Sequence, residues 1–209
     1  MAAMISRGVV ASLLAVSLLL AGCGDDAPPP AQSSSAPPST STPTASSSAS
    51  VPPLQGSPVF DRIRQRGRLL IGVRSDAPEL AAFQEYTGKW AGFDPAIARL
   101  IATELGFPDE KQVSFKKMPP NLQISGVASD SVDLQLGVLD REAATQAKVA
   151  TAGPYVIVGG APQYIGVIAR DKVFTERLGK IIADALASGR WDQLAADELA
   201  AKRVPFSKP

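Results

Sequence analysis

The chain has 209 residues with 21 basic and 20 acidic side chains, so its formal net charge is only +1. This balance offers no basic surface of the kind that binds nucleic acid, and we expect no nucleic-acid partner. The chain has no histidine and one cysteine, which excludes a histidine-dependent triad and an internal disulfide and argues against structural zinc. We therefore predict neither a metal nor a cofactor.

Residues 1–22 predict a secretory targeting segment. Arg7 supplies a positive charge, and residues 9–20 form an apolar run that is too short to cross a membrane comfortably. The run ends in Leu20-Ala21-Gly22-Cys23, which resembles a bacterial lipobox. The resemblance implies that Cys23 becomes the first mature residue and carries a lipid, which anchors the protein to the outer side of the cell membrane. The alternative is an ordinary signal peptide with an incidental cysteine.

Residues 23–57 consist almost entirely of Pro, Ser, Thr and Ala, and their only charges are Asp25 and Asp26. A segment with so few large apolar side chains cannot offset the entropy lost on ordering. We predict a disordered tether with partial polyproline II character. It is either a bare spacer or an O-glycosylated one.

The predicted folded domain covers residues 58–209 and begins with a short helix that starts at Pro58 and ends at Gly67. Residues 68–73 are an apolar run that predicts a buried strand. Some twenty loop residues follow. Asp94 then stands before a proline, as a helix N-cap would, and the next helix is expected to end before Gly106. Such a long loop after a strand is usually functional, because ligands bind beyond the carboxyl ends of strands in open α/β sheets.

The rest of the chain is expected to alternate strands and helices. The predicted strands are 112–116, 131–137, 152–155 and 163–170, and the predicted helices are 122–128, 140–147, 174–188 and one that opens near residue 189.

The stretch GVRSD…TGKWAGFDPAIARLIATELG resembles the start of the polar amino-acid (family 3) extracytoplasmic solute-binding proteins of ABC transporters, in particular actinobacterial glutamate/glutamine-type members. The short Val132-Asp133-Leu134 element and the Gly189-Arg190-Trp191 element fit the same pattern. The resemblance implies the type II periplasmic-binding-protein fold, which has two lobes.

The second lobe is expected to be missing. In the family it follows the exit strand, here Ala152–Tyr155, whereas residues 156–162 lead directly into a segment that resembles the family's return strand. Residues 58–209 suffice for about one ordinary domain. We predict an α/β protein with a single three-layer lobe and a mostly parallel sheet flanked by helices.

The resemblance implies that the long loop contributes to the solute site. Asp76 stands at the family's acidic ligand position, Phe83 or Tyr86 would form an aromatic wall, and Trp90 would close the edge of the cleft. Each has a structural alternative, because Asp76 is also suited to cap the turn before a proline and the aromatic side chains to cover the sheet edge.

The resemblance also implies an arginine that binds the solute α-carboxylate, but Thr145 stands at that position and Asp140 at the family's threonine position. A shift of one helical turn would let Arg141 take the role, since a guanidinium fork suits a carboxylate. The alternative is that Asp140 caps a helix and Arg141 is a solvated charge.

Three hypotheses for function follow. The first is a reduced solute-binding lipoprotein that recognises an amino acid or another small polar solute for an ABC permease, alone or with a partner protein. The second is an interaction or sensor lipoprotein that keeps the lobe as a scaffold. The third is an enzyme, as in relatives such as cyclohexadienyl dehydratase; since no general acid/base pair is visible, we predict no catalytic residues.

Overall fold

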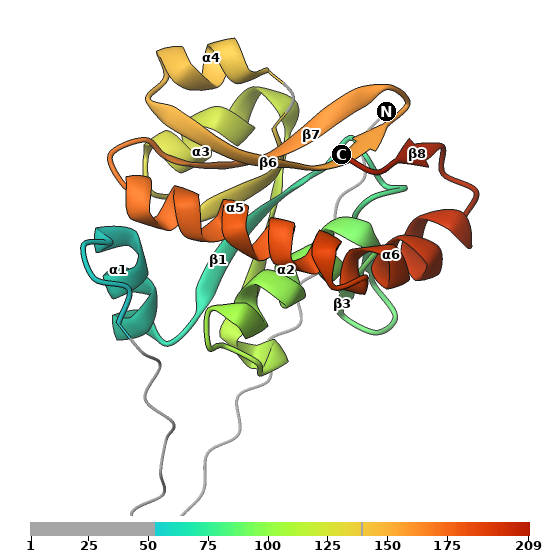
Figure 1. Ribbon diagram of the computed structural model, residues 1–209, viewed down its shortest axis with the longest axis horizontal. Coiled ribbons are helices and arrows are strands. Elements are labelled where there is room, and N and C mark those ends of the chain that lie inside the picture. The colour runs from blue at the N-terminus through green and yellow to red at the C-terminus, as the bar shows by residue number, and fades with distance from the viewer. Residues whose placement is uncertain (1–52, 139) are drawn as a thin grey trace, which may run out of the picture. The chain divides into compact units, whose positions relative to one another are not determined.

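The computed structural model describes residues 53–138 and 140–209. The predicted targeting segment, Cys23 and most of the tether lie outside this part of the chain. The described part forms a six-stranded sheet in the order β4-β1-β5-β7-β6-β8 and a separate hairpin, β2–β3 (Figure 1). The strands are β1 (Leu69–Arg74), β2 (Ala82–Gln84), β3 (Lys89–Ala91), β4 (Val113–Met118), β5 (Leu134–Val138), β6 (Val149–Val158), β7 (Ala161–Ile168) and β8 (Phe206–Ser207).

The sheet is mostly parallel in strand direction, as predicted. β1 pairs in parallel with β4 and β5, and β7 runs antiparallel to both β5 and β6, so that β6 points the same way as β1. β8 is antiparallel to β6. The strands β4, β1 and β5 therefore end at one edge, with Met118, Arg74 and Val138. We call this end of the sheet, where the carboxyl ends of the three strands lie, the carboxyl edge.

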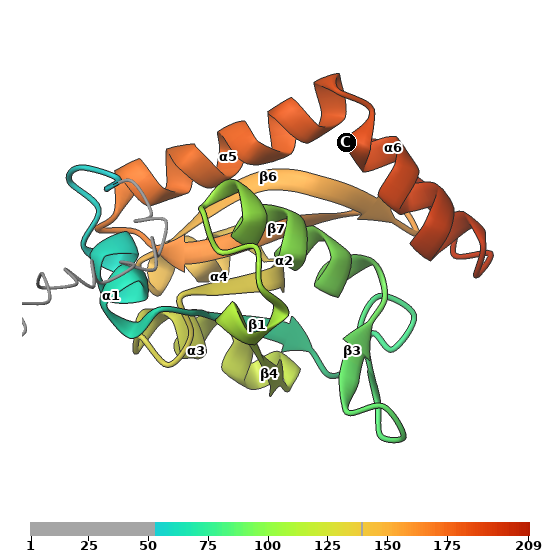
Figure 2. The same cartoon turned by 90° about the horizontal axis from the view of Figure 1, so that it is seen from below.

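Helices cover both faces of the sheet. α5 (Lys172–Ala187) and α6 (Arg190–Ala195) lie on one side of it and α3 (Gln123–Ala128) on the other (Figure 2). α2 (Phe93–Glu104) contacts both α5 and α6 and so belongs to their layer, whereas α4 (Arg141–Gln146) packs against β6. The single three-layer lobe is confirmed. No helix among the described residues is long and apolar enough to span a membrane.

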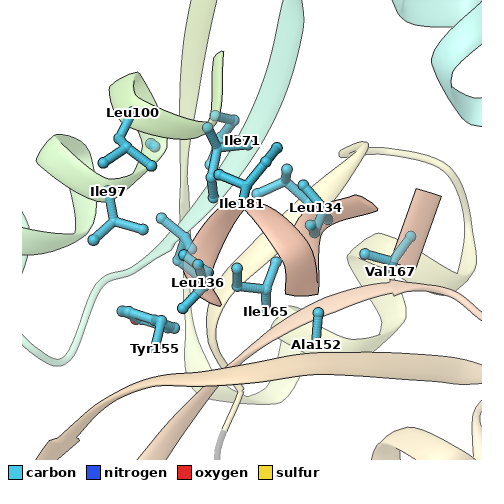
Figure 3. Close-up of a cluster of buried hydrophobic side chains, with 14 of the residues drawn as sticks. Ile71, Ile97, Leu100, Leu134, Leu136, Ala152, Tyr155, Ile165, Val167 and Ile181 are labelled. Carbon is cyan, nitrogen blue, oxygen red and sulfur yellow. The ribbon is translucent and has the colours of Figure 1, made fainter. Parts of the chain in front are cut away.

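The core lies between the central strands and the helices. Ile71, Leu134, Leu136 and Ile165 of the strands gather with Ile97, Leu100 and Ile181 of the helices (Figure 3). These side chains carry the apolar periodicity of the sequence, which explains why most predicted elements are present with small shifts at their ends.

The start of α2 differs from the prediction. The helix begins at Phe93 after Gly92, and Asp94 lies inside its first turn, fully buried, so its predicted role as N-cap is wrong. The reason is that a buried tyrosine hydroxyl from β6 binds the carboxylate, which therefore does not bind the helix backbone. At the other end Gly106 has a φ of 91°, as predicted for the glycine after a helix.

The exit and return strands, β6 and β7, form one continuous hairpin. Val158 pairs with Ala161, and only Gly159 and Gly160 lie between them, with φ of 57° and 82°. Two consecutive positive φ values are typical of the type I′ turn that closes two-residue hairpins. The described chain thus passes directly from β6 to β7 where the family resemblance places the second lobe.

Two further features were not predicted. The long loop after β1 is not a plain connection, because it contains the β2–β3 hairpin. Near the C-terminus, β8 adds two residues to the edge of the sheet beside β6.

The start of the domain is fixed by one buried carboxylate. Asp171 caps α5 by accepting from the Phe174 amide, and its other oxygen accepts from the Ser57 hydroxyl at 2.7 Å and the Val59 amide at 2.9 Å. Ser57 in turn caps α1 (Pro58–Arg66), which ends at Gly67 as predicted. The first turns of two helices that are far apart in sequence thus share one side chain.

Candidate functional site

An arginine lies at the carboxyl edge, where a solute-binding site is expected. Arg74 is the last residue of β1, and its Nε and Nη2 donate to the two carboxylate oxygens of Asp76 at 3.2 and 2.9 Å. Its Nη1 donates to Oε1 of Gln163 in β7 at 3.0 Å. The Arg74 side chain is 12% exposed and that of Asp76 38%, so the guanidinium is largely shielded from solvent while the carboxylate stays accessible to it.

The two charges stabilise each other. The hydrogen bond from Arg74 is the largest cause of a lowered pKa at Asp76. Desolvation lowers the pKa of Arg74, but the hydrogen bond and charge of Asp76 more than offset this and hold it above its usual value. Both groups are therefore charged at neutral pH, and the guanidinium is already neutralised by its own chain.

A buried carboxylate, Asp94, contributes a further negative charge to this site. It accepts from the Tyr155 hydroxyl through Oδ1 at 2.7 Å, while its Oδ2 has no hydrogen-bond partner among the described residues. Burial raises the pKa of Asp94 to about 6, against the opposing effects of the Tyr155 hydrogen bond and the Arg74 charge. Burial, followed by the Asp94 charge, also raises the pKa of Tyr155 well above its usual value.

Gly137 of β5 makes room for the arginine. Its φ is 79°, and a Cβ built there would lie 2.4 Å from Cδ of Arg74. Such an approach is impossible for any residue with a side chain unless the arginine moves. We call the five side chains Arg74, Asp76, Asp94, Tyr155 and Gln163 the carboxyl-edge cluster.

The loop hairpin forms a second feature, an aromatic hollow. Phe83 of β2 and Trp90 of β3 have ring centroids 5.5 Å apart, and Trp90 lies 6.0 Å from Phe115 of β4. These three rings line a cavity of about 600 Å³ together with polar groups, among them Glu85 and Lys117. The structure thus brings Phe83, a predicted wall residue, together with Trp90, which was predicted to close the edge of the cleft.

Tyr86 does not join this wall. It is fully exposed at the tip of the β2–β3 hairpin, so it covers neither the sheet nor the hollow. Of the predicted loop residues, only Asp76 belongs to the carboxyl-edge cluster.

The residues predicted on α4 lie elsewhere. Asp140 accepts from the Ala143 amide at 2.9 Å and caps the helix, which was the structural alternative for it. Arg141 is exposed, stands 5.0 Å above the Tyr164 ring and donates from Nε to the Thr151 hydroxyl at 3.3 Å. Arg141 contacts Tyr164 of β7, whereas Arg74 contacts Gln163, the residue just before it. Because successive side chains of a strand face opposite sides, the two arginines approach β7 from different faces.

Sequence reasoning missed Arg74, Gln163 and the role of Asp94. A signal for Arg74 was present, because a charged residue at the last position of an apolar strand needs a partner. No group of three or more metal-ligating side chains occurs within residues 53–138 and 140–209.

Residues 69–197 match the family model described as bacterial extracellular solute-binding proteins, family 3. The chain belongs to this family. The matched range begins with β1 and ends within the last helical segment, so it includes the carboxyl-edge cluster and the β6–β7 hairpin.

A glutamine-binding protein from Geobacillus stearothermophilus is 27% identical to this family 3 chain over 84 residues, which is 40% of the chain and 32% of that relative. The chain thus matches about a third of the length of that protein. Among solved structures, an arginine-bound form of domain 1 from TmArgBP is 26% identical with a TM-score of 0.51, covering 59% of this chain and 98% of that one. The cysteine-binding protein from Campylobacter jejuni has a TM-score of 0.60 at 17% identity, covers 68% and 93% of the two chains, and shows the fold alone.

Proposed function

We propose that this family 3 protein is an extracytoplasmic receptor that presents one lobe to an amino acid or a similar small polar solute. The observation that carries the proposal is the charged cluster, with its unpartnered buried carboxylate oxygen, at the carboxyl edge of a family 3 lobe. The match to a glutamine-binding protein and the likeness to domain 1 of TmArgBP, solved in an arginine-bound form, support a solute of this class.

We further propose that it acts as the substrate-binding component for uptake by an ABC transporter and that its affinity is low. A single lobe supplies only one side of a cleft, and each lost charge-assisted hydrogen bond costs about 1.5–3 kcal/mol, where 1.4 kcal/mol is a tenfold change. Isothermal titration calorimetry on the chain with glutamate, glutamine and arginine tests this. We expect dissociation constants of about 1 mM or weaker. A micromolar constant for any of them that is lost in Asp76→Ala would contradict the low affinity but keep the receptor.

Lipid attachment at Cys23 is the proposed anchor. The lipobox-like residues before the only cysteine of the chain support it. Cells expressing the wild type should incorporate an alkyne-labelled fatty acid into the protein, and Cys23→Ala should not, while Asp26→Ala serves as the matched control that keeps the cysteine. Equal labelling of wild type and Cys23→Ala would refute the anchor.

A second candidate function is an interaction or sensor lipoprotein. It is favoured by one observation, the exposed aromatic side chains of the β2–β3 hairpin, where Phe83 is 49% exposed and Tyr86 fully exposed. A photo-crosslinking amino acid at position 86 distinguishes the two. Crosslinks to an ABC permease would favour the transport role, and crosslinks to another extracytoplasmic protein would favour the sensor role. ABC permease genes beside the gene for this protein would also favour the transport role.

A further inference from the structure

The guanidinium of Arg74 is held in the way a binding site holds a ligand. Asp76 receives two of its N–H groups side by side, and the Gln163 amide oxygen receives a third from the neighbouring nitrogen. This paired arrangement is the one by which proteins recognise arginine and guanidinium groups. Here the bound group comes from the same chain, and little of it reaches solvent.

The space around the arginine is shaped to its side chain. Gly137, in the left-handed region, lies so close to Cδ of Arg74 that a Cβ would collide with it. The same glycine backbone lies near the Tyr155 hydroxyl, which donates to Asp94. Removing the arginine side chain would therefore leave a hollow bounded by Gly137, Asp76, Gln163 and the tyrosine–aspartate pair.

The charge of the cluster also favours a cation in this hollow. Arg74 is its one positive group, while Asp76 and Asp94 supply two carboxylates. Asp94 is fully buried, and its Oδ2 has no partner among the described residues. Without the arginine, both carboxylates would lose the positive charge that favours their ionised forms, which is unfavourable unless a cation enters.

We propose that Arg74 is an internal ligand that fills a guanidinium-binding site built by Asp76, Gln163 and the buried Asp94, and that it thereby excludes cationic solutes from this lobe. The solute of the wild-type protein is then neutral or acidic. This specificity rests on the proposed function at the carboxyl edge, but the site itself does not, because an emptied site binds free guanidinium whatever the natural solute is.

The test uses the full chain, purified in mild detergent, as wild type and as Arg74→Ala. The probes are guanidinium chloride and L-arginine at about 10 mM, far below denaturing concentrations, with sodium chloride at equal ionic strength as the reference. We expect the variant to bind guanidinium with a dissociation constant of about 1 mM by calorimetry, which is within the range open to so small a ligand. The wild type should bind it at least about tenfold more weakly.

Two further variants make the result specific. Arg170→Ala is the matched control, since it also removes an arginine paired with an aspartate, Asp130, but at the exposed start of α5. It should bind guanidinium no better than the wild type. Adding Asp94→Asn to Arg74→Ala should weaken guanidinium binding several-fold, and an unchanged affinity would show that the buried carboxylate takes no part.

The outcomes separate this site from the proposed receptor role. A folded Arg74→Ala that gains no guanidinium binding overturns the internal ligand, even if the wild type binds glutamine. If Arg74→Ala does not fold in sodium chloride, near-ultraviolet circular dichroism decides instead. Recovery of the native signal with guanidinium but not with sodium supports the site, and failure to recover refutes it. Binding of guanidinium but not L-arginine would show that the hollow accepts the free ion only, which refutes the exclusion of cationic amino acids as its role.

Discussion

Replacing Asp94 by asparagine should remove a pH dependence of folding that this buried carboxylate imposes. Burial raises its pKa from the ordinary 3.8 to about 6 in the folded protein. The folded state therefore holds the proton more tightly than the unfolded state does. The resulting stability is complete below pH 3.8 and is lost as the pH rises through the folded pKa, so the window runs from about pH 4 to pH 6.

The size of the effect follows from the shift. About two pKa units at 1.36 kcal/mol each give about 3 kcal/mol lost from the wild type between pH 4 and pH 7. Asparagine has nearly the shape of the protonated carboxyl group and still offers an oxygen to the Tyr155 hydroxyl, but it does not ionise. The free energy of unfolding of Asp94→Asn, relative to wild type, should therefore rise by about 3 kcal/mol over this range.

Urea unfolding at pH 4, 5, 6 and 7, followed by tryptophan fluorescence, measures this difference. The comparison between variant and wild type cancels the titration of other carboxylates, such as Asp133, whose pKa is also raised by burial. Asp184→Asn, an exposed change in α5, is the control and should run parallel to wild type. If the free energy of unfolding of Asp94→Asn follows that of the wild type in parallel from pH 4 to pH 7, burial does not destabilise the ionised carboxylate and the reasoning is wrong.

Four other substitutions test the fold around the site. Gly159→Ala and Gly160→Ala should each lower the free energy of unfolding by about 1–2 kcal/mol, because both need positive φ although nothing crowds them; no loss in urea unfolding would speak against the type I′ turn. Ser57→Ala should cost about 1–2 kcal/mol by removing the cap of α1 and its bond to Asp171, and α1 amides should then exchange hydrogen faster, which unchanged exchange would contradict. Trp191→Phe should cost about 1–3 kcal/mol, since the indole N–H donates to a buried β6 carbonyl at 2.6 Å, and an unchanged thermal midpoint would argue against that bond.

The sequence predicted most of the sheet and the long helices because their apolar residues recur at the period of the element. It did not predict what Asp94 does. The local pattern of aspartate before proline fits an N-cap, whereas the group that binds its carboxylate, Tyr155, is 61 residues away. The cluster around Arg74 escaped prediction for the same reason, since its contact with Gln163 spans 89 residues and depends on strand order. The hairpin β2–β3 escaped because its strands are three residues long and partly polar.

If the proposed lipid anchor at Cys23 holds the protein, the carboxylate of Asp171 has a mechanical consequence. Tension along the N-terminal segment would reach Ser57 after the few described residues before it, and there this carboxylate binds the first turns of α1 and α5 together. Pulling there shears two helix starts against each other, and several short hydrogen bonds must break at once. The next element, β1, lies inside the sheet between β4 and β5 and cannot be peeled from an edge. The end from which the domain would be pulled is thus held by a buried carboxylate and followed by an internal strand.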